Sequence, residues 1–247
     1  MQVSDFSREA HLVREQLIPI GIDEAGRGPL AGPVVAAAVL LKKEYLEFLA
    51  HSNGRHFMLK REKEWGLIRD SKKLSEQQRE KAFALVQEFF HVGVGIVSAE
   101  TIDRVNILQA TFLAMRSAIS ELRRIMNQEL GIKGEEKLVL LVDGNQKIPN
   151  TSLQQVTVVD GDGLVKSIAA ASIIAKVTRD RLIILADHEY PAYGFARHKG
   201  YGTKEHMDAL RKYGPTPLHR KSFRPVQLAN PETVNKRFSN VLKPKNK

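Results

Sequence analysis

Apolar and β-branched stretches predict five strands along the chain. They cover Gln16–Asp23, Pro33–Leu41, His91–Val97, Lys137–Asp143 and Gln155–Val159. The fourth stretch, KLVLLVD, shows no alternation of polar and apolar residues, which is typical of a strand buried on both faces. We therefore expect it to be the central strand of a sheet and to run parallel to the first strand.

Helical patterns lie between and after these strands. Ser75 and Gln78 form a capping-box pattern ahead of the run AFALVQEFF, so a helix should begin there. Apolar residues recur at helical spacing over Leu108–Leu130, a long helix rich in small residues begins near Val165, and Thr203 precedes a shorter one. Strands that alternate with helices predict an α/β fold with a mixed five-stranded sheet flanked by helices.

The remaining patterns argue against a membrane protein. The longest apolar run, Leu30–Leu41, contains Gly32 and Pro33 and is far shorter than the ~18 residues that a membrane span needs. With no cysteine and no signal-peptide pattern at its N-terminus, the sequence predicts a cytoplasmic protein.

A polar excursion, His51–Leu67, interrupts the predicted elements, and we interpret it as surface decoration.

Charge divides the 247 residues unevenly. The formal net charge is +10, yet Phe195–Lys247 alone holds 13 basic and 3 acidic residues, so the rest of the chain is balanced. Within Phe195–Arg224 the basic residues are interleaved with aromatic ones, a mixture that suits binding to nucleic-acid backbones. We therefore predict a catalytic or structural unit over residues 1–194 and a basic, mainly helical region over residues 195–247 that binds the phosphates of a substrate.

Acidic residues follow two of the predicted strands. Asp23 and Glu24 come after the first strand and Asp143 after the fourth, so Asp23 and Asp143 should meet at one edge of the sheet if these strands are adjacent and parallel. Glu24 can join them only if the strand breaks there, because consecutive side chains of a strand point to opposite faces. Asp162, in the sequence GDG, could supply a fourth oxygen ligand.

Such a cluster of carboxylates predicts a site for hard cations. Carboxylates that lose solvation and repel one another need cations between them, and ligation by oxygen alone favours Mg²⁺ or Mn²⁺. Two such ions ~3.5–4 Å apart can drive phosphodiester hydrolysis. Taken singly, each Asp-Gly pair is an ordinary turn, and Asp160 is kept in that class. The dispersed histidines His198, His206 and His219 are expected at the surface.

Seven motifs of the chain resemble one family. They are GIDEAGRGPLAGPVVAAAVLL, DSKKLS, NILQAT, LVDG, DGLVKSIAAASIIAKVTRDR, HKGYGTKEH and HRKSF. In this order and at these spacings they resemble bacterial ribonuclease HII, from about Ile18 to Pro225. The resemblance implies a ribonuclease H-like fold with a small helical C-terminal region. It also implies an endonuclease that cuts RNA in RNA–DNA hybrids and 5′ of ribonucleotides embedded in duplex DNA, leaving 5′-phosphate and 3′-hydroxyl ends, in ribonucleotide removal and RNA primer degradation.

The resemblance assigns roles position by position. Asp23, Glu24, Asp143 and Asp162 match the family's four catalytic, metal-binding acids, and Asp162 is chosen over Asp160 because it stands six residues before the isoleucine of IAAAS.

Other positions match residues that contact the substrate. Gly26, Arg27 and Gly28 match the GRG element, whose backbone contacts the 2′-hydroxyl of the ribonucleotide. Tyr201 matches the tyrosine that packs against the deoxyribose after it. Two further matches, placed near substrate phosphates, are Lys72 and Asn106.

Two other functions stay open on the sequence alone. One is a nuclease of the same fold that cuts DNA, and the other is a nucleic-acid binder without activity. The expected partners are RNA–DNA hybrids and duplex DNA that contains ribonucleotides, with a sliding clamp as a further candidate, and we expect a monomer. The resemblance fades after Pro225, which leaves the role of the tail open.

Overall fold

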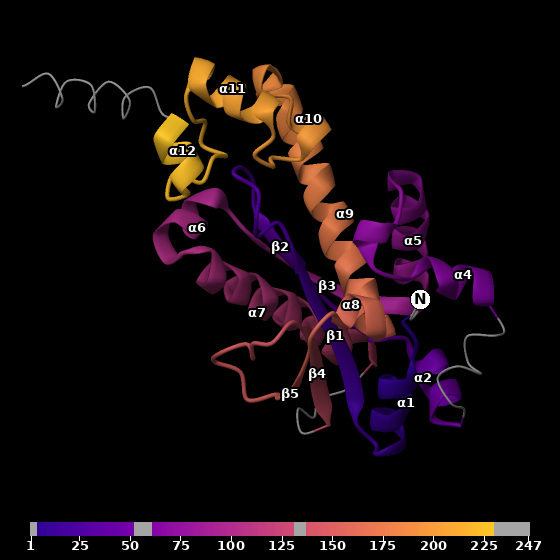
Figure 1. Ribbon diagram of the computed structural model, residues 1–247. Coiled ribbons are helices and arrows are strands. Elements are labelled where there is room, and N and C mark those ends of the chain that lie inside the picture. Colours follow the sequence, from indigo (N-terminus) through magenta and orange to yellow (C-terminus); the bar gives the residue numbers. More distant parts are fainter. Residues whose placement is uncertain (1–3, 52–60, 131–136, 230–247) are drawn as a thin grey trace, which may run out of the picture. The chain divides into compact units, whose positions relative to one another are not determined.

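The computed structural model describes residues 4–51, 61–130 and 137–229 (Figure 1). These residues form two compact units. The sheet unit comprises the described residues of Met1–Ala25, Val35–Ile96 and Thr111–Thr178, and the helical unit comprises those of Gly26–Val34, Val97–Ala110 and Arg179–Lys247. The helical unit therefore combines the described part of the predicted C-terminal region with two segments from much earlier in the chain.

A mixed five-stranded sheet lies in the sheet unit, in the order β3-β2-β1-β4-β5. β1 pairs antiparallel with β2 and parallel with β4, and β4 pairs parallel with β5. The five predicted strands are confirmed, with bounds β1 Ile18–Ala25, β2 Val34–Leu41, β3 Phe90–Val97, β4 Leu138–Asp143 and β5 Gln154–Val158. KLVLLVD forms β4, a buried strand with neighbours on both sides that runs parallel to β1, as predicted, but the middle of the sheet is β1, because β2 and β3 extend the sheet on its other side.

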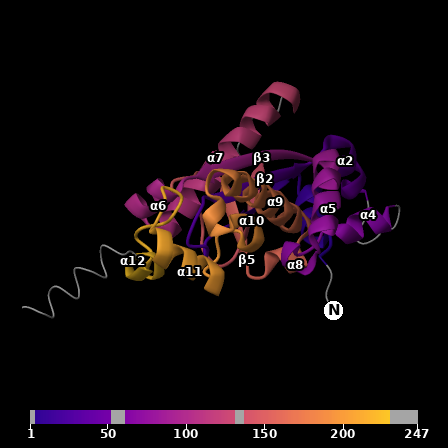
Figure 2. The same ribbon diagram turned by 90° about the horizontal axis from the view of Figure 1, so that it is seen from above.

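Helices cover both faces of the sheet (Figure 2). On one face, the alanines at the start of α9 (Lys166–Glu189) join Ala37 and Val39 of β2 in a continuous apolar core. On the other face, α7 (Ile107–Ile125) approaches β3 so closely that a side chain at Gly95 would collide with the Ala114 carbonyl. The predicted helix over Leu108–Leu130 corresponds to α7 and to the π-helical turn that follows it, η2 Met126–Leu130.

Shorter helices complete the sheet unit. The predicted capping box is confirmed, because the Ser75 hydroxyl accepts from the Gln78 N–H while the Gln78 side chain accepts from the Ser75 N–H. This box starts α5, and reciprocal capping of this kind stabilises a helix by about 1 kcal/mol. The bounds are α1 Ser7–Arg14, α2 Lys43–Ala50, α4 Glu62–Leu67, η1 Ser71–Lys73, α5 Glu76–Phe89 and α8 Gly161–Leu164.

The excursion His51–Leu67 is more than surface decoration. Residues 52–60 lie outside the described part of the chain, but α4 carries Trp65, which is only 1% exposed. Its ring centroid lies 4.1 Å from that of Phe89 and 5.1 Å from that of Phe6. The surface prediction is wrong for this helix, because one large apolar ring among polar neighbours produces no periodic signal.

The helical unit is built around a small apolar core that includes Leu30, Phe195 and Leu210. Thr203 caps α11 as predicted, its hydroxyl accepting from the His206 N–H at 3.3 Å. The bounds of the short helices are α6 Ala99–Val105, η3 Pro191–Tyr193, α10 Phe195–His198, α11 Lys204–Tyr213 and α12 Arg224–Ala229. Across the described part of the chain, no helix combines the length and apolar character that crossing a membrane requires.

Candidate active site

Asp23 and Asp143 lie side by side at the C-terminal ends of two parallel strands. The register of β1 and β4 pairs Ile22 with Val142, and the next residue on each strand is an aspartate. Asp23 is only 5% exposed, and Asp143 Oδ1 accepts a hydrogen bond from the Gly161 N–H at 2.8 Å. The structure thus brings together the two acids that the strand pattern predicts to meet.

β1 does not break between Asp23 and Glu24. The strand continues through Glu24 and Ala25, which pair with Ala36 and Val35 of β2, and the backbone leaves the extended region only at Gly26, where φ is 98°. The condition set for both side chains to converge, a break in the strand at Glu24, is therefore not met. The two residues are linked locally instead, because the Glu24 N–H donates to Asp23 Oδ1 at 2.7 Å.

Asp162 joins the cluster from α8, the short helix that follows β5. It is 7% exposed, whereas Asp160 is exposed and adopts a left-handed conformation with φ of 54° before the helix starts. Gly161, between them, donates its N–H to Asp143. The structure therefore keeps Asp160 in a turn and places Asp162 where the charge of Asp143 acts on its carboxyl group.

The N-terminal segment holds the backbone next to Asp162. Asp5 pairs with Val165, and its N–H donates to the Leu164 carbonyl at 3.3 Å. Glu9, on α1, accepts from the Ser167 N–H at 2.8 Å and is 2% exposed. Burial raises the pKa of Glu9 to about 7. The junction of α8 and α9, which carries Asp162, is thus fixed by residues from the start of the chain.

Burial and like charges act together on these acids. Burial raises the pKa of Asp23 well above its usual range, and the charges of Glu24 and Asp143 raise it further. A hydrogen bond from the Ser172 hydroxyl partly opposes this rise, and the Ser71 hydroxyl lies 2.9 Å from the Ser172 hydroxyl. Sequence reasoning missed both serines, because their contact joins segments 101 residues apart.

Lys72 supplies positive charge to the cluster. Its ammonium lies 3.4 Å from Asp162 Oδ2. Burial raises the pKa of Asp162, as do Asp70 and Asp143, while Lys72 opposes the rise. Partial burial lowers the pKa of Lys72, but the attraction of Asp162 and Asp23 outweighs it, so the net direction is upward. Asp70 is a further carboxylate that sequence reasoning missed, although it opens the DSKKLS motif.

The donor set fits hard divalent cations by its chemistry. Over residues 4–51, 61–130 and 137–229, no group of three or more histidine, cysteine, aspartate or glutamate side chains is placed so that it could hold a metal ion as it stands. The acids nevertheless offer only oxygen atoms, and burial with mutual repulsion raises the pKa of Asp23 and Asp162. A cation between them would relieve both effects, so these residues fit Mg²⁺ or Mn²⁺.

The predicted substrate-contacting residues Gly26, Arg27, Gly28 and Tyr201 gather in the helical unit. Gly26 is buried, whereas Arg27 and Gly28 are exposed. A side chain at Gly28 would lie 3.8 Å from Tyr201 Cε1, and Tyr201 is 44% exposed. The loop and the tyrosine therefore form one continuous, partly exposed surface.

Comparison with known proteins identifies the family. A family model described as Ribonuclease HII matches residues 20–226. The chain belongs to the ribonuclease HII family. Ribonuclease HII of Fusobacterium nucleatum subsp. nucleatum is 49% identical over 205 residues, which cover 83% of this chain and 84% of that protein. Ribonuclease HII of Chlorobium luteolum is 45% identical over 229 residues, which cover 92% of this chain and 99% of that protein.

Solved structures agree with the ribonuclease HII assignment. The ribonuclease H2 from Pyrococcus horikoshii OT3 has a TM-score of 0.60 at 24% identity, covers 93% of this chain and 100% of its own, and shows the ribonuclease H-like fold. The PCNA:RNase HII complex from Archaeoglobus fulgidus gives a TM-score of 0.56 at 26% identity, over 84% of this chain and 96% of that chain. The predicted fold and family are confirmed, and the enzyme is an endoribonuclease H, a hydrolase.

Asn106 has a structural role at the start of a helix. It stands between α6 and α7 with φ of 70°, and its Oδ1 accepts from the Gln109 N–H at 3.1 Å. It therefore caps the start of α7. A contact with substrate phosphate stays a prediction for this exposed side chain and for Lys72.

The three histidines of the C-terminal region are buried, contrary to prediction. His198 is 8% exposed, His206 is fully buried and His219 is 1% exposed. His206 Nδ1 lies 2.9 Å from the Tyr201 carbonyl, so it carries the proton and donates. His206 Nε2 then accepts from His219 Nε2–H at 2.9 Å, and His219 Nδ1 accepts from the Thr216 N–H. These hydrogen-bonded neutral rings hold the Tyr201 carbonyl from its buried side.

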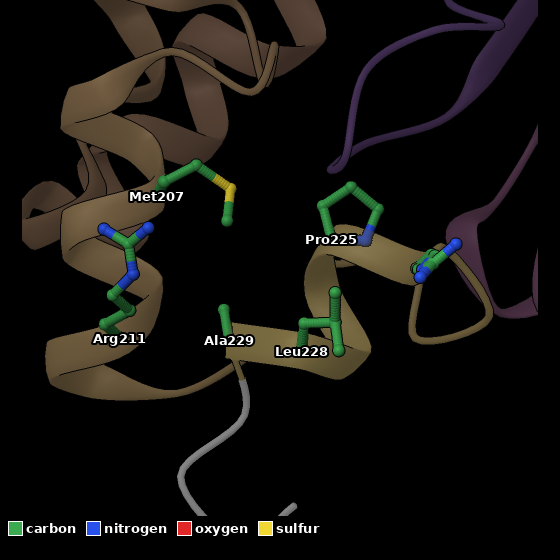
Figure 3. Close-up of a pocket in the computed structure, with 6 residues that line it drawn as sticks. Met207, Arg211, Pro225, Leu228 and Ala229 are labelled. Atoms are coloured by element: carbon green, nitrogen blue, oxygen red, sulfur yellow. The ribbon is translucent and has the colours of Figure 1, made fainter. Parts of the chain in front are cut away.

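A groove of about 320 Å³ lies between α11 and α12 (Figure 3). Met207, Pro225 and Leu228 give it an apolar lining, and none of the predicted site residues takes part. The lining residues are Met207, Arg211, Arg224, Pro225, Leu228 and Ala229.

Proposed function

We propose that the chain is a divalent-metal-dependent endonuclease that hydrolyses the RNA strand of RNA–DNA hybrids and cuts 5′ of ribonucleotides embedded in duplex DNA. Its products would carry 5′-phosphate and 3′-hydroxyl ends. The observation that carries this proposal is the convergence of Asp23, Asp143 and Asp162, from three separate segments, at one place in the sheet unit. Family membership supports the reaction class, and the acids support its mechanism.

Asp23, Glu24, Asp143 and Asp162 would hold two Mg²⁺ or Mn²⁺ ions. Bound ions of this kind activate a water and stabilise the leaving oxygen of a phosphodiester. The protein orients the ligands beforehand, since the Gly161 N–H holds Asp143 and the Ser172 hydroxyl holds Asp23. The carboxylates would draw closer together on binding, because among the described residues no three of them are placed to hold an ion together.

The helical unit would recognise two consecutive sugars on the 3′ side of the cut. The backbone of Gly26, Arg27 and Gly28 would contact the 2′-hydroxyl, which only ribose carries. Tyr201 offers an exposed ring for the next deoxyribose, and its position beside Gly28 fits contacts to neighbouring nucleotides. Residues 195–247 would act as a basic substrate-binding region, and residues 1–194 as a catalytic domain. A sliding clamp on the tail stays a prediction, because residues 230–247 lie outside the described chain.

Labelled duplexes that contain no, one or many ribonucleotides test this function. With Mg²⁺ or Mn²⁺, wild type should cut the second and third and leave the first intact. Asp143→Asn and Asp162→Asn should each lower kcat/KM by roughly 10²–10³-fold, because a lost metal ligand removes several kcal/mol of transition-state stabilisation. Asp160→Asn is the matched control: it removes the same charge two residues from Asp162, in a left-handed position that Asn tolerates.

Each alternative gives a different result in the same assay. A DNA nuclease of this fold would cut the all-DNA duplex at a comparable rate. A non-enzymatic binder would bind the hybrids and cut none of them. If Asp143→Asn turned over normally, the assignment of the acids would be wrong whatever the substrate.

A further inference from the structure

Two fully buried arginines lie at the centre of the helical unit. Arg220 donates hydrogen bonds to five carbonyl oxygens of the loop 26–33 at 2.5–3.2 Å. Those carbonyls belong to Gly26, Arg27, Pro29, Gly32 and Pro33. The loop is therefore wound around a single guanidinium group, which ties its two ends and its middle to one point.

Arg179 joins the same loop to the segment that carries Tyr201. Its guanidinium donates to the Pro33 and Ala31 carbonyls, both at 3.1 Å, and to the Lys199 carbonyl at 3.0 Å. Its Cζ lies 5.9 Å from the centroid of the Tyr201 ring. The two segments also bond directly, since the Gly200 carbonyl accepts from the Leu30 N–H at 2.8 Å. Loop and tyrosine are thus parts of one rigid assembly.

The burial of two guanidinium groups is unfavourable to the free energy of folding. Burial lowers the pKa of Arg220 to about 9, and the neighbouring charge of Arg179 acts in the same direction. Replacing buried charges by well-packed apolar residues is often neutral or stabilising. A guanidinium, however, has five N–H donors in a fixed plane, and no apolar residue can set the directions of several carbonyls at once. Arg179 and Arg220 therefore fix the directions of the carbonyl groups that they bind.

We propose that Arg179 and Arg220 are positioning residues: they fix the Gly26–Gly28 backbone relative to Tyr201 and so set the preference for cutting where ribose is followed by deoxyribose. This inference rests on the proposed function, which gives the loop the 2′-hydroxyl and Tyr201 the next sugar. Both contacts must form together at such a junction. Inside a long RNA tract no deoxyribose follows, so cleavage there depends less on the spacing between loop and ring.

Conservative variants of the full chain test the proposal. Arg179→Lys and Arg220→Lys keep the charge but lack the planar set of five donors that reaches carbonyls in several directions. The measured quantity is the ratio of kcat/KM for a single embedded ribonucleotide to kcat/KM for a long RNA–DNA hybrid. We expect this ratio to fall on the order of 10-fold, since displacements near 1 Å can cost up to 10²-fold in rate. Arg181→Lys, an exposed arginine on the same helix, is the control and should leave the ratio unchanged.

A second variant keeps the test decisive if the lysine variants fail to fold. A methyl group at Gly200, where φ is 80°, would lie 2.6 Å from the Ala31 carbonyl oxygen. Gly200→Ala should therefore push the two segments apart with both arginines present, and lower the same ratio. In a Tyr201→Ala background, Arg179→Lys should lower the ratio no further, because the arginine acts through the tyrosine.

Two outcomes would contradict different claims. Folded variants that lose thermal stability but keep the wild-type ratio would overturn the inference and leave the arginines a purely structural role. Wild type that cuts neither duplex would overturn the proposed function instead.

Discussion

Lys72 shows how one side chain changes the chemistry of the acid cluster. Its ammonium lies 3.4 Å from Asp162 Oδ2 and is attracted by Asp23 as well. The acids are thus partly neutralised by a charge that belongs to the protein. A divalent ion would meet the same oxygens and would compete with this ammonium for them.

Lys72→Met should therefore bind divalent ions more tightly than wild type. The lysine side chain is 79% exposed, so the ion pair contributes no more than about 1 kcal/mol, equivalent to roughly 5-fold in Kd. Calorimetric titration with Mn²⁺, without substrate, measures this directly. Lys73→Met is the control, because Lys73 pairs with Asp70 at 3.2 Å instead. An unchanged or weaker Kd in Lys72→Met would show that the ammonium does not compete.

At the scale of elements, α11 and the segment after it are joined by uncharged histidines. Burial lowers the pKa of His206 to about 4 and that of His219 to about 3, to which the neighbouring His206 also contributes. A proton on His206 Nε2 would place two N–H groups against each other across the 2.9 Å contact, and a proton on His219 Nδ1 would face the Thr216 N–H. The sequence around these residues is polar and predicts a surface, because their burial depends on contacts with Phe195 and with each other that form only in the folded chain.

The histidines should make the chain less stable in mild acid. Because their folded pKa values lie below the ordinary ~6.5, the unfolded chain binds more protons between about pH 6.5 and 4. Their contribution to the free energy of unfolding is complete above about pH 6.5 and is lost as pH falls, by roughly 3 kcal/mol at most for His206. Denaturant unfolding should give a shallower pH slope for His206→Gln than for wild type. His188→Gln, a substitution outside the buried cluster, should keep the wild-type slope.

At the scale of the molecule, charge is concentrated in the part expected to bind substrate. Residues 195–247 hold 13 basic and 3 acidic residues, and the rest of the chain is balanced. Lys212 and Lys221 are exposed, so they can meet phosphates along a duplex. Such contacts release counterions, and binding should weaken as salt rises.

Replacing Lys212 and Lys221 by Ala should flatten the dependence of log K on log salt concentration. The slope should fall by ~0.9 for each phosphate that the variant no longer neutralises. Lys81→Ala removes an exposed charge from the sheet unit and should leave the slope unchanged. The measurement is the binding constant for an uncut hybrid over a series of salt concentrations. An unaltered slope in the double variant would remove these lysines from the interface.

The sequence predicts what local pattern and strand order determine. The strands, the capping box at Ser75 and the meeting of Asp23 with Asp143 follow from periodicity and from the rule that parallel strands end at one edge. Long-range contacts were beyond such reasoning. The burial of Trp65, the Ser71–Ser172 contact and the roles of Arg179 and Arg220 depend on segments that meet only in the folded chain.

The hydrogen bonds of Asp5 and Glu9 with the α8–α9 junction limit how far this protein can be truncated at its N-terminal end. The family match begins at residue 20, so both residues lie in a stretch that a boundary drawn from the family would discard. Yet they bond Leu164 and Ser167, shortly after Asp162. A chain trimmed to the matched region would keep every proposed ligand, but the helix that carries one of them would lose its anchor.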